Sequence, residues 1–510
     1  MPDGFDGPPR IIFRVEGQAL MAEGQCDACS ATVAVTQPHL PAGSRYVLSA
    51  TIDLELDAGH LAVGGPQLRG GVLVLNRSAL MLGRYFDHPH RLSNASAAFR
   101  RVWGESAVQE ALSQMVSLGL IMPYGCTAPA PIETPQTLAA WLHLTNACQL
   151  ACDYCYRSRS SAEMSPEVGR LAVDAIFRSA LAHGFTTVKL KYAGGEPTLR
   201  FPLLVELHHH AAGTATRHGL ELDGVVISNG VGLTPRMIDT VQALGLRLVL
   251  SLDGVGGYHD CQRHFADGSG SFDMVAHSID LALACGLVPN ISVTVTGRNA
   301  AGLPELMSWL LERNLPFGLS FYREYARAVP SDLRLEEESV IEGLLAAYRV
   351  IEKHLPQRSL LAVLADRANL STPHLRPCGI GINYLAIDPA GRVAGCQMDL
   401  GHALTDVHDP DPLSRVQEGY KDLYNPPVDE KAGCAECQWR YWCCGGCPLE
   451  AHRVTINRDA RSPNCDIYRA LFPEMVRLEG LRLLRYGDST PERGLGHAAA
   501  SPSQSGSAAR

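Results

Sequence analysis

The chain has 510 residues, of which 46% are hydrophobic and 19% charged, and its formal net charge is −9. The length predicts about three domains, the apolar fraction excludes global disorder, and the acidic excess argues against a broad nucleic-acid-binding surface. We expect no membrane span, since no apolar run reaches about 18 residues, and no secretory signal peptide. The 16 cysteines favour metal binding in a reducing cytoplasm, where dense thiols more often hold metal than form disulfides.

Two segments are predicted before the central part of the chain. Residues 1–70 are expected to be a β-rich segment whose role the sequence does not reveal. Residues 71–123 contain a strand-like run followed by two helical stretches, which predicts a small winged-helix-like module. The Pro-rich segment 124–137 is predicted to be a linker.

Residues 138–355 alternate strand-like and helical patterns. Apolar runs bounded by Gly, Asp or Asn are typical of buried parallel strands. Six βα repeats therefore predict an α/β fold with a partial (β/α)6, TIM-like barrel, which binds its ligands at the C-terminal strand ends. The predicted strands are Trp141–Asn146, Val188–Ala193, Gly224–Asn229, Arg247–Asp253, Ile291–Thr296 and Phe317–Tyr322.

The C-terminal part is dominated by cysteines. Residues 356–377 are expected to be a connector, residues 378–486 a cysteine-rich domain and residues 487–510 a disordered tail. Near the start of this domain, Asn383–Asp388 and Arg392–Cys396 flank a turn at Pro389–Gly391, which predicts a β-hairpin that delivers Cys396.

A first cysteine group directly follows the first barrel strand, where such a barrel places its chemistry. Cys148, Cys152 and Cys155 read CxxxCxxC. Three thiolates can hold three irons of a [4Fe–4S] cluster and leave the fourth iron open. The alternative is a zinc site that lacks a fourth ligand.

Polar groups follow the next strands at the same rim. Strand two ends in Gly194-Gly195-Glu196-Pro197, strand three in Ser228-Asn229-Gly230 and strand four in Ser251-Leu252-Asp253-Gly254. Glycines allow close approach of the backbone to a ligand, and a carboxylate binds an ammonium group. Taken singly, the Gly-Gly-Glu-Pro motif is a weak signal that more often marks a turn, and the other two motifs are equally consistent with an ordinary turn at a strand end.

Together these residues resemble the radical SAM superfamily over roughly residues 138–325. The resemblance implies that Cys148, Cys152 and Cys155 hold a catalytic [4Fe–4S] cluster whose open iron binds S-adenosylmethionine. It places Tyr154 by the adenine and Gly194, Gly195 and Glu196 at the methionine amino group, with Asn229, Ser251 and Asp253 near the ribose and carboxylate. The implied chemistry is one-electron cleavage to a 5′-deoxyadenosyl radical, which abstracts hydrogen from an unactivated C–H bond. A low-potential donor such as flavodoxin or ferredoxin would supply the electron.

The second cysteine group reads Cys378, then Gly391-x4-Cys396, then Cys434-x2-Cys437-x5-Cys443-x3-Cys447, and finally Cys465. This spacing resembles a SPASM domain; a zinc ribbon is the alternative. The resemblance implies two auxiliary [4Fe–4S] clusters, for three clusters in all. Auxiliary cluster I would have three cysteine ligands. Its fourth iron would stay open, or it would bind a water or other non-cysteine ligand, Cys444 or a substrate thiolate. Its ligands are Cys378, Cys396 and Cys447, and those of auxiliary cluster II are Cys434, Cys437, Cys443 and Cys465.

The resemblance to SPASM-bearing enzymes predicts a precursor peptide as substrate. The winged-helix-like segment would capture a leader peptide by strand addition, and the reaction would form a thioether, a carbon crosslink or another oxidation. One alternative is an anaerobic, formylglycine-forming sulfatase maturase. Such enzymes carry an Asp directly after the Gly-x4-Cys cysteine, where this chain has Gln397, and its nearest acid is Asp399. The other alternative is a non-catalytic iron–sulfur electron-transfer scaffold.

Overall fold

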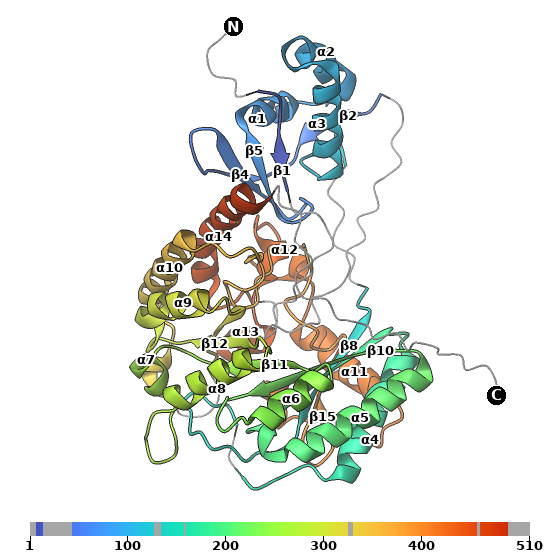
Figure 1. The fold of residues 1–510 in the computed structure, drawn as a ribbon. Helices are drawn as coiled ribbons and strands as arrows, with labels where there is room; N and C mark the ends of the chain where they lie inside the picture. Colours follow the sequence, from blue (N-terminus) through green and yellow to red (C-terminus); the bar gives the residue numbers. More distant parts are fainter. Residues whose placement is uncertain are drawn as a thin grey trace, which may run out of the picture.

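Two interleaved sheets build the N-terminal module, which lies at the top of Figure 1. The computed structural model describes residues 7–13, 43–126, 134–157, 160–324, 330–455 and 460–487. One sheet has the strand order β1-β5-β4-β3 and the other β6-β2-β7. The strands are β1 Ile11–Ile12, β2 Arg45–Leu48, β3 Ile52–Glu55, β4 His60–Gly64, β5 Val72–Asn76, β6 His90–Arg91 and β7 Ile121–Pro123.

Helices α1 Arg77–Arg84, α2 Leu92–Trp103 and α3 Glu105–Ser117 complete this module. The division proposed between residues 70 and 71 does not follow the hydrogen bonding, because β5 pairs with both β1 and β4. Likewise β2 pairs with β7. The two predicted segments therefore share their sheets. The sequence did not indicate this, because strands that pair across a long separation in the chain leave no local signal.

Six parallel strands form the open barrel, in the order β13-β12-β11-β10-β9-β8. Each predicted strand overlaps one observed strand, and the predicted α/β fold is confirmed. Local signals start the covering helices; for example, the Ser165 hydroxyl accepts from the Val168 N–H at the start of α4, where Pro166 stands first. The strands are β8 Thr137–His143, β9 Thr187–Ala193, β10 Glu221–Ser228, β11 Arg247–Ser251, β12 Asn290–Val295 and β13 Phe317–Phe321. The helices are α4 Pro166–Ala182, α5 Phe201–His218, α6 Pro235–Ala243, α7 Gly257–Asp260, α8 Phe272–Ala284, α9 Leu303–Glu312 and α10 Glu337–Lys353.

The predicted hairpin is present, and it extends the barrel sheet. Strand β14 Tyr384–Ile387 pairs with β15 Arg392–Ala394 in antiparallel fashion and with β8 in parallel fashion. The short strand β16 Thr405–Asp406 then pairs with β15. The cysteine-rich domain is thus joined by backbone hydrogen bonds to the strand that precedes Cys148. Its helices are α11 Pro412–Tyr424, α12 Arg440–Cys443, α13 Pro448–Thr455 and α14 Cys465–Tyr486.

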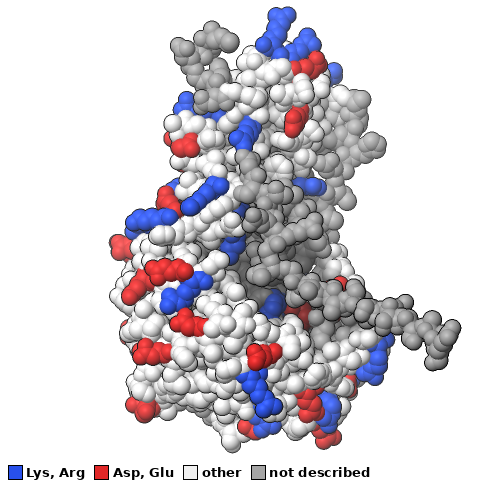
Figure 2. Space-filling view, in the orientation of Figure 1, with Lys and Arg blue, Asp and Glu red and all other residues white. Residues whose placement is uncertain are grey.

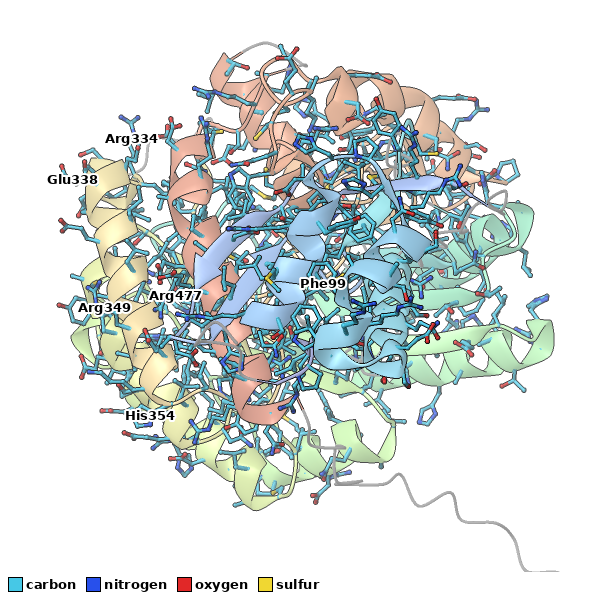
Figure 3. The ribbon with its side chains drawn as sticks, turned by 90° about the horizontal axis from the view of Figure 1, so that it is seen from above. Phe99, Arg334, Glu338, Arg349, His354 and Arg477 are labelled. Carbon is cyan, nitrogen blue, oxygen red and sulfur yellow. The ribbon has the colours of Figure 1, made fainter. Side chains whose placement is uncertain are left out.

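Helix α14, which the sequence did not reveal, belongs to the cysteine-rich domain and contacts both the barrel and the N-terminal module. It lies beside α10 (Figure 3), where Arg477 Nη1 donates to Glu352 Oε1 at 2.9 Å. Its residues also pack against the N-terminal sheet: an added Cβ on Gly480 would lie 2.6 Å from Ala62 Cβ. A helix that packs on both sides has apolar residues around its circumference, so it lacks the one-sided stripe that identifies surface helices.

The described surface mixes charges of both signs. On the face shown in Figure 2, Lys and Arg lie among Asp and Glu on the barrel and on the N-terminal module. In the part of the chain that the structure describes, no helix is both long and apolar enough to span a bilayer.

Candidate active site

The first cysteine group lies on the loop that follows β8. Cys148, Cys152 and Cys155 are all half-buried. Two backbone hydrogen bonds fasten the loop to the segment after α7: Ala151 N–H to His264 O at 2.6 Å and Asp153 N–H to Gln262 O at 3.1 Å. Burial raises the pKa of Cys152, and the neighbouring thiols Cys155 and Cys148 raise it further, to about 11. The loop therefore brings Cys148 and Cys155 near enough to Cys152 to affect its thiol, at the C-terminal end of the strand; a shared [4Fe–4S] cluster on the three sulfurs stays a prediction.

The Gly-Gly-Glu segment after β9 packs directly on this loop. Gly195 N–H donates to Thr145 O at 2.6 Å, and Glu196 N–H donates to Ala147 O at 2.8 Å. A Cβ on Gly195 would lie only 1.9 Å from Ala147 O, so only glycine fits there. Gly194 has a φ of +152° and lies against the Thr145 carbonyl.

Glu196 is fully buried, and burial raises the pKa of its carboxyl group. Its oxygens accept hydrogen bonds from Thr198 Oγ1 at 2.7 Å and from the Asn229 backbone N–H at 2.7 Å. The side chain therefore fixes the Gly-Gly-Glu segment to the end of β10. The contact of Gly194, Gly195 and Glu196 with a methionine amino group stays a prediction.

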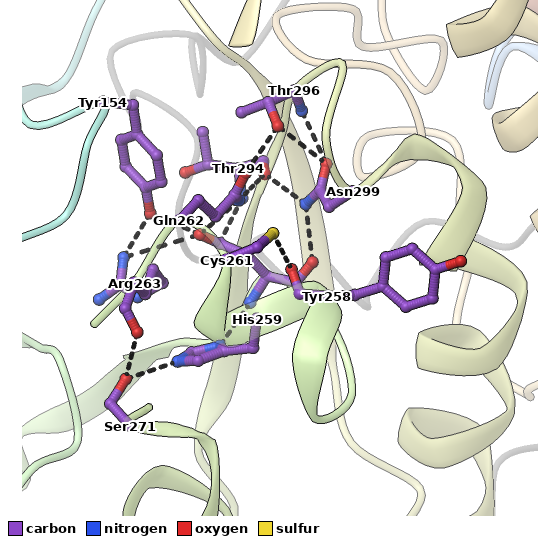
Figure 4. Close-up of polar contacts among 11 residues, drawn as sticks. Tyr154, Tyr258, His259, Cys261, Gln262, Arg263, Ser271, Thr294, Thr296 and Asn299 are labelled. Atoms are coloured by element: carbon purple, nitrogen blue, oxygen red, sulfur yellow. Dashed lines mark hydrogen bonds and ion pairs between the residues drawn. The ribbon is translucent and has the colours of Figure 1, made fainter. Parts of the chain in front are cut away.

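Tyr154 and Asp253 belong to one buried network, of which Figure 4 labels Tyr154, Gln262 and Arg263. The Tyr154 hydroxyl donates to Asp253 Oδ2 at 2.5 Å. Asp253 is fully buried and also accepts from Gln262 Nε2 at 3.0 Å and from the Thr294 N–H at 2.8 Å. Its carboxylate thus holds together the barrel rim and the cysteine loop, and a contact with ribose stays a prediction, as it does for Ser251 at the end of β11.

Arg263 completes this network and carries no signal in the sequence. Its Nη1 donates to the Tyr154 hydroxyl at 2.5 Å and lies 3.9 Å from Asp253 Oδ2. Burial raises the pKa of Tyr154, so the phenol stays protonated and keeps its hydrogen bond to the carboxylate. The buried charge of Asp253 is balanced by the Arg263 guanidinium rather than by solvent.

Arg157 and His143 are further functional candidates that the sequence analysis did not identify. Arg157 Nη1 lies 3.1 Å from His143 Nε2, and its Nη2 donates to the Gly195 carbonyl at 3.3 Å. Burial and the charge of Arg157 lower the pKa of His143 to about 3. The imidazole is therefore neutral and accepts from Arg157, which links β8 to the Gly-Gly-Glu segment. The position of Arg157, two residues after Cys155, is the one available sequence signal.

A cavity of about 490 Å³ lies between the cysteine loop and the β14–β15 hairpin. Barrel residues form one wall and residues of the turn and of the segment after Cys396 form the other. Its volume suits a side chain or small ligand. The lining residues are His143, Asn146, Tyr156, Arg157, Asp388, Pro389, Arg392, Gln397, Met398, Leu400 and Gly401.

The second cysteine group forms a site of its own. A small cavity is lined by all four residues assigned to auxiliary cluster II: Cys434, Cys437, Cys443 and Cys465. Burial raises the pKa of Cys443 to about 12, with Cys434, Cys465 and Cys437 adding to the rise. The four sulfurs are therefore grouped around one space, as a cluster with four thiolate ligands requires.

The remaining cysteines of this domain do not line that cavity. For Cys378, Cys396 and Cys447 a shared auxiliary cluster I stays a prediction. Cys444 is fully buried and its thiol donates to the His374 carbonyl at 3.0 Å. Within the described ranges, no three or more His, Cys, Asp or Glu side chains are arranged to hold a single metal ion.

Comparisons with known proteins bear on these sites. Residues 142–310 match the Radical SAM superfamily. The chain is 25% identical over 362 residues to the Fe-coproporphyrin III synthase of Methanosarcina barkeri, covering 63% of this chain and 86% of that protein. It is 27% identical over 371 residues to the PqqA peptide cyclase of Xanthomonas axonopodis pv. citri, covering 65% and 88%. The structure of anSMEcpe with bound AdoMet and Cp18Cys peptide superposes with a TM-score of 0.54 at 17% identity, covering 67% of this chain and 99% of that one, which shows a shared fold.

Proposed function

We propose that this chain, a radical SAM enzyme that uses S-adenosylmethionine and a [4Fe–4S] cluster, is a maturase that modifies a precursor peptide. The similarity to a PqqA peptide cyclase supports a peptide substrate. When bound, the cofactor supplies a 5′-deoxyadenosyl radical by one-electron reductive cleavage, and this radical takes a hydrogen atom from the peptide. The product would be a thioether, a carbon crosslink or another oxidation.

The observation that carries the proposal is the cavity between the cysteine loop and the hairpin. Arg157 contributes to its barrel wall, and Arg392, Gln397 and Met398 contribute to its hairpin wall. A peptide side chain in this space would lie between the catalytic cysteines and Cys396. A radical formed there could then pass its electron to auxiliary cluster I and its proton to solvent or a protein group, which balances the oxidation.

The other parts of the chain have roles consistent with this proposal. Cys148, Cys152 and Cys155 would hold the catalytic cluster, and the two SPASM cysteine sets would hold two auxiliary clusters. Among the described strands β3 and β7 end their sheets, so a leader peptide could add there as a further strand. Flavodoxin or ferredoxin would donate the electron, and a reducing cytoplasm would protect the clusters.

The sulfatase-maturase alternative is not favoured. The position directly after Cys396 holds Gln397. Asp399, the nearest acid, accepts from the Tyr420 hydroxyl at 2.6 Å and pairs with Arg453 Nη2 at 3.3 Å. A carboxylate engaged in this way is poorly placed to act as a base. If the chain were instead a non-catalytic iron–sulfur electron-transfer scaffold, the reconstituted protein would form no 5′-deoxyadenosine.

Anaerobic co-expression with a short peptide encoded beside this gene, followed by mass spectrometry, tests the proposal. Wild-type protein should change the peptide mass. In Met398→Trp the indole fills part of the cavity and displaces the peptide side chain. A displacement of about 1 Å lowers a rate about 100-fold, so the rate of peptide modification should fall by about this factor. The variant should still form 5′-deoxyadenosine.

Met274→Trp is the matched control, because Met274 is exposed on α8, and it should behave as wild type. An unchanged peptide mass with wild-type protein that does form 5′-deoxyadenosine would contradict the maturase proposal for that peptide. Equal modification by Met398→Trp and Met274→Trp would contradict the assignment of the cavity.

A further inference from the structure

We infer that Asn229 is a positioning residue that donates an N–H···S hydrogen bond to Cys148 and thereby raises the reduction potential of the catalytic cluster. The inference rests on the cluster part of the proposed function and is independent of the peptide. It also differs from the contact with the ribose or carboxylate of S-adenosylmethionine that the family resemblance implied for Asn229.

The geometry places the amide nitrogen between two acceptors. Asn229 directly follows β10 and is 6% exposed. Its Nδ2 lies 3.5 Å from Cys148 Sγ and 3.2 Å from Gln149 Oε1. A side-chain amide carries two N–H groups on this nitrogen, so one can serve the sulfur and the other the Gln149 oxygen.

The rest of Asn229 is fixed by its own partners. Its Oδ1 accepts from the Val231 N–H at 2.7 Å, which settles which way the amide faces, because the flipped amide would place two donors together. Its backbone N–H donates to Glu196 Oε2 at 2.7 Å. The donor is therefore held toward the sulfur by contacts within the chain.

The consequence for a bound cluster follows from charge. An N–H group that donates to a ligand sulfur stabilises negative charge on that sulfur, and Asn229 Nδ2 is held in this position beside Cys148 Sγ. Reduction of a cluster adds an electron and increases that charge, so a hydrogen bond to a ligand sulfur stabilises the reduced form more than the oxidised form. The amide thus makes the electron transfer that precedes S-adenosylmethionine cleavage easier.

The same contact joins the cofactor-binding segment to the cluster. Glu196 is anchored on one side by Thr198 and on the other by the Asn229 backbone. The Asn229 side chain then continues this chain of contacts to Cys148. A shift of the Gly-Gly-Glu segment would therefore reach the cluster ligand through a single residue.

A redox titration of the reconstituted, full-length holoenzyme followed by EPR tests the inference. The catalytic signal is the one missing from a variant in which Cys148, Cys152 and Cys155 are all replaced by alanine. Asn229→Asp preserves size and the acceptor for the Val231 N–H but cannot donate to the sulfur. For this variant we expect the ratio of reduced to oxidised cluster at a fixed potential to fall about tenfold, which corresponds to a reduction potential lower by about 59 mV for one electron. The reduction potential of Asn229→Ala should fall by less.

Ser228→Ala is the control, since it removes a hydrogen bond to the Gly230 N–H in the same turn without touching the sulfur; its potential should match wild type. Equal potentials in all three variants and wild type would overturn the inference. Should the Asn229 variants take up no cluster, pulsed EPR of wild-type holoenzyme with ¹⁵N-labelled asparagine decides. A nitrogen coupling to the reduced catalytic cluster is expected, and its absence overturns the hydrogen bond. Neither readout uses the peptide, so a failed peptide assay leaves the result intact.

Discussion

Gly195→Ala is the substitution whose effect the structure defines most directly. The new Cβ would lie 1.9 Å from Ala147 O and 2.5 Å from Ala147 C, both atoms of the backbone. Backbone cannot move aside as a flexible side chain can, so the Gly-Gly-Glu segment and the cysteine loop must separate by more than about 1 Å to reach an ordinary contact. Overpacking of this kind costs about 1–3 kcal/mol.

The separation also breaks the hydrogen bonds that join the two segments. Gly195 N–H to Thr145 O and Glu196 N–H to Ala147 O are 2.6 and 2.8 Å long, and each contributes about 1 kcal/mol. Together with the overpacking, we expect Gly195→Ala to lower the free energy of unfolding by about 3–5 kcal/mol. Displacement of Glu196 should also abolish formation of 5′-deoxyadenosine by reconstituted enzyme.

Urea denaturation of the reduced apo-protein, followed by circular dichroism, measures the first effect. Gly213→Ala is the matched control: an added Cβ there has no neighbour within 4 Å. Gly213 lies inside α5, so alanine should stabilise the helix by about 0.5–1 kcal/mol. A wild-type midpoint for Gly195→Ala would refute the claim that the glycine is required by close contact of the two segments.

Three further predictions concern single residues. His143 stays neutral in the folded state because its pKa is about 3, whereas the unfolded chain takes up a proton below pH 6.5. When the pH is lowered from 6.5 to 5, the free energy of unfolding measured by urea titration should therefore fall by about 2 kcal/mol more in wild type than in His143→Gln. Arg263→Met leaves Asp253 buried without its cation and should cost about 3–5 kcal/mol, more than Arg334→Met at an exposed pair; equal losses would contradict the network. Cys465→Ser should lower the bound iron by one cluster and leave 5′-deoxyadenosine formation measurable, whereas unchanged iron content would contradict auxiliary cluster II.

Local patterns in the sequence determined the barrel and its motifs. Apolar runs bounded by Gly, Asp and Asn gave all six parallel strands, and turn residues gave the β14–β15 hairpin, because these signals act within a few residues of the chain. The CxxxCxxC spacing and the Gly-Gly-Glu segment likewise predicted a shared rim, since parallel strands end at one edge of the sheet.

The tertiary structure alone decided how these parts meet. No spacing predicts that the hairpin pairs with β8, that α14 packs between the N-terminal sheet and α10, or that β5 pairs with β1. Arg263 and Arg157 entered the site only through contacts made after folding, and Asn229 proved to face the Cys148 sulfur. Such contacts join residues up to hundreds of positions apart. Their energy depends on the distance between the groups in space and on their burial, and no local pattern in the sequence contains either quantity.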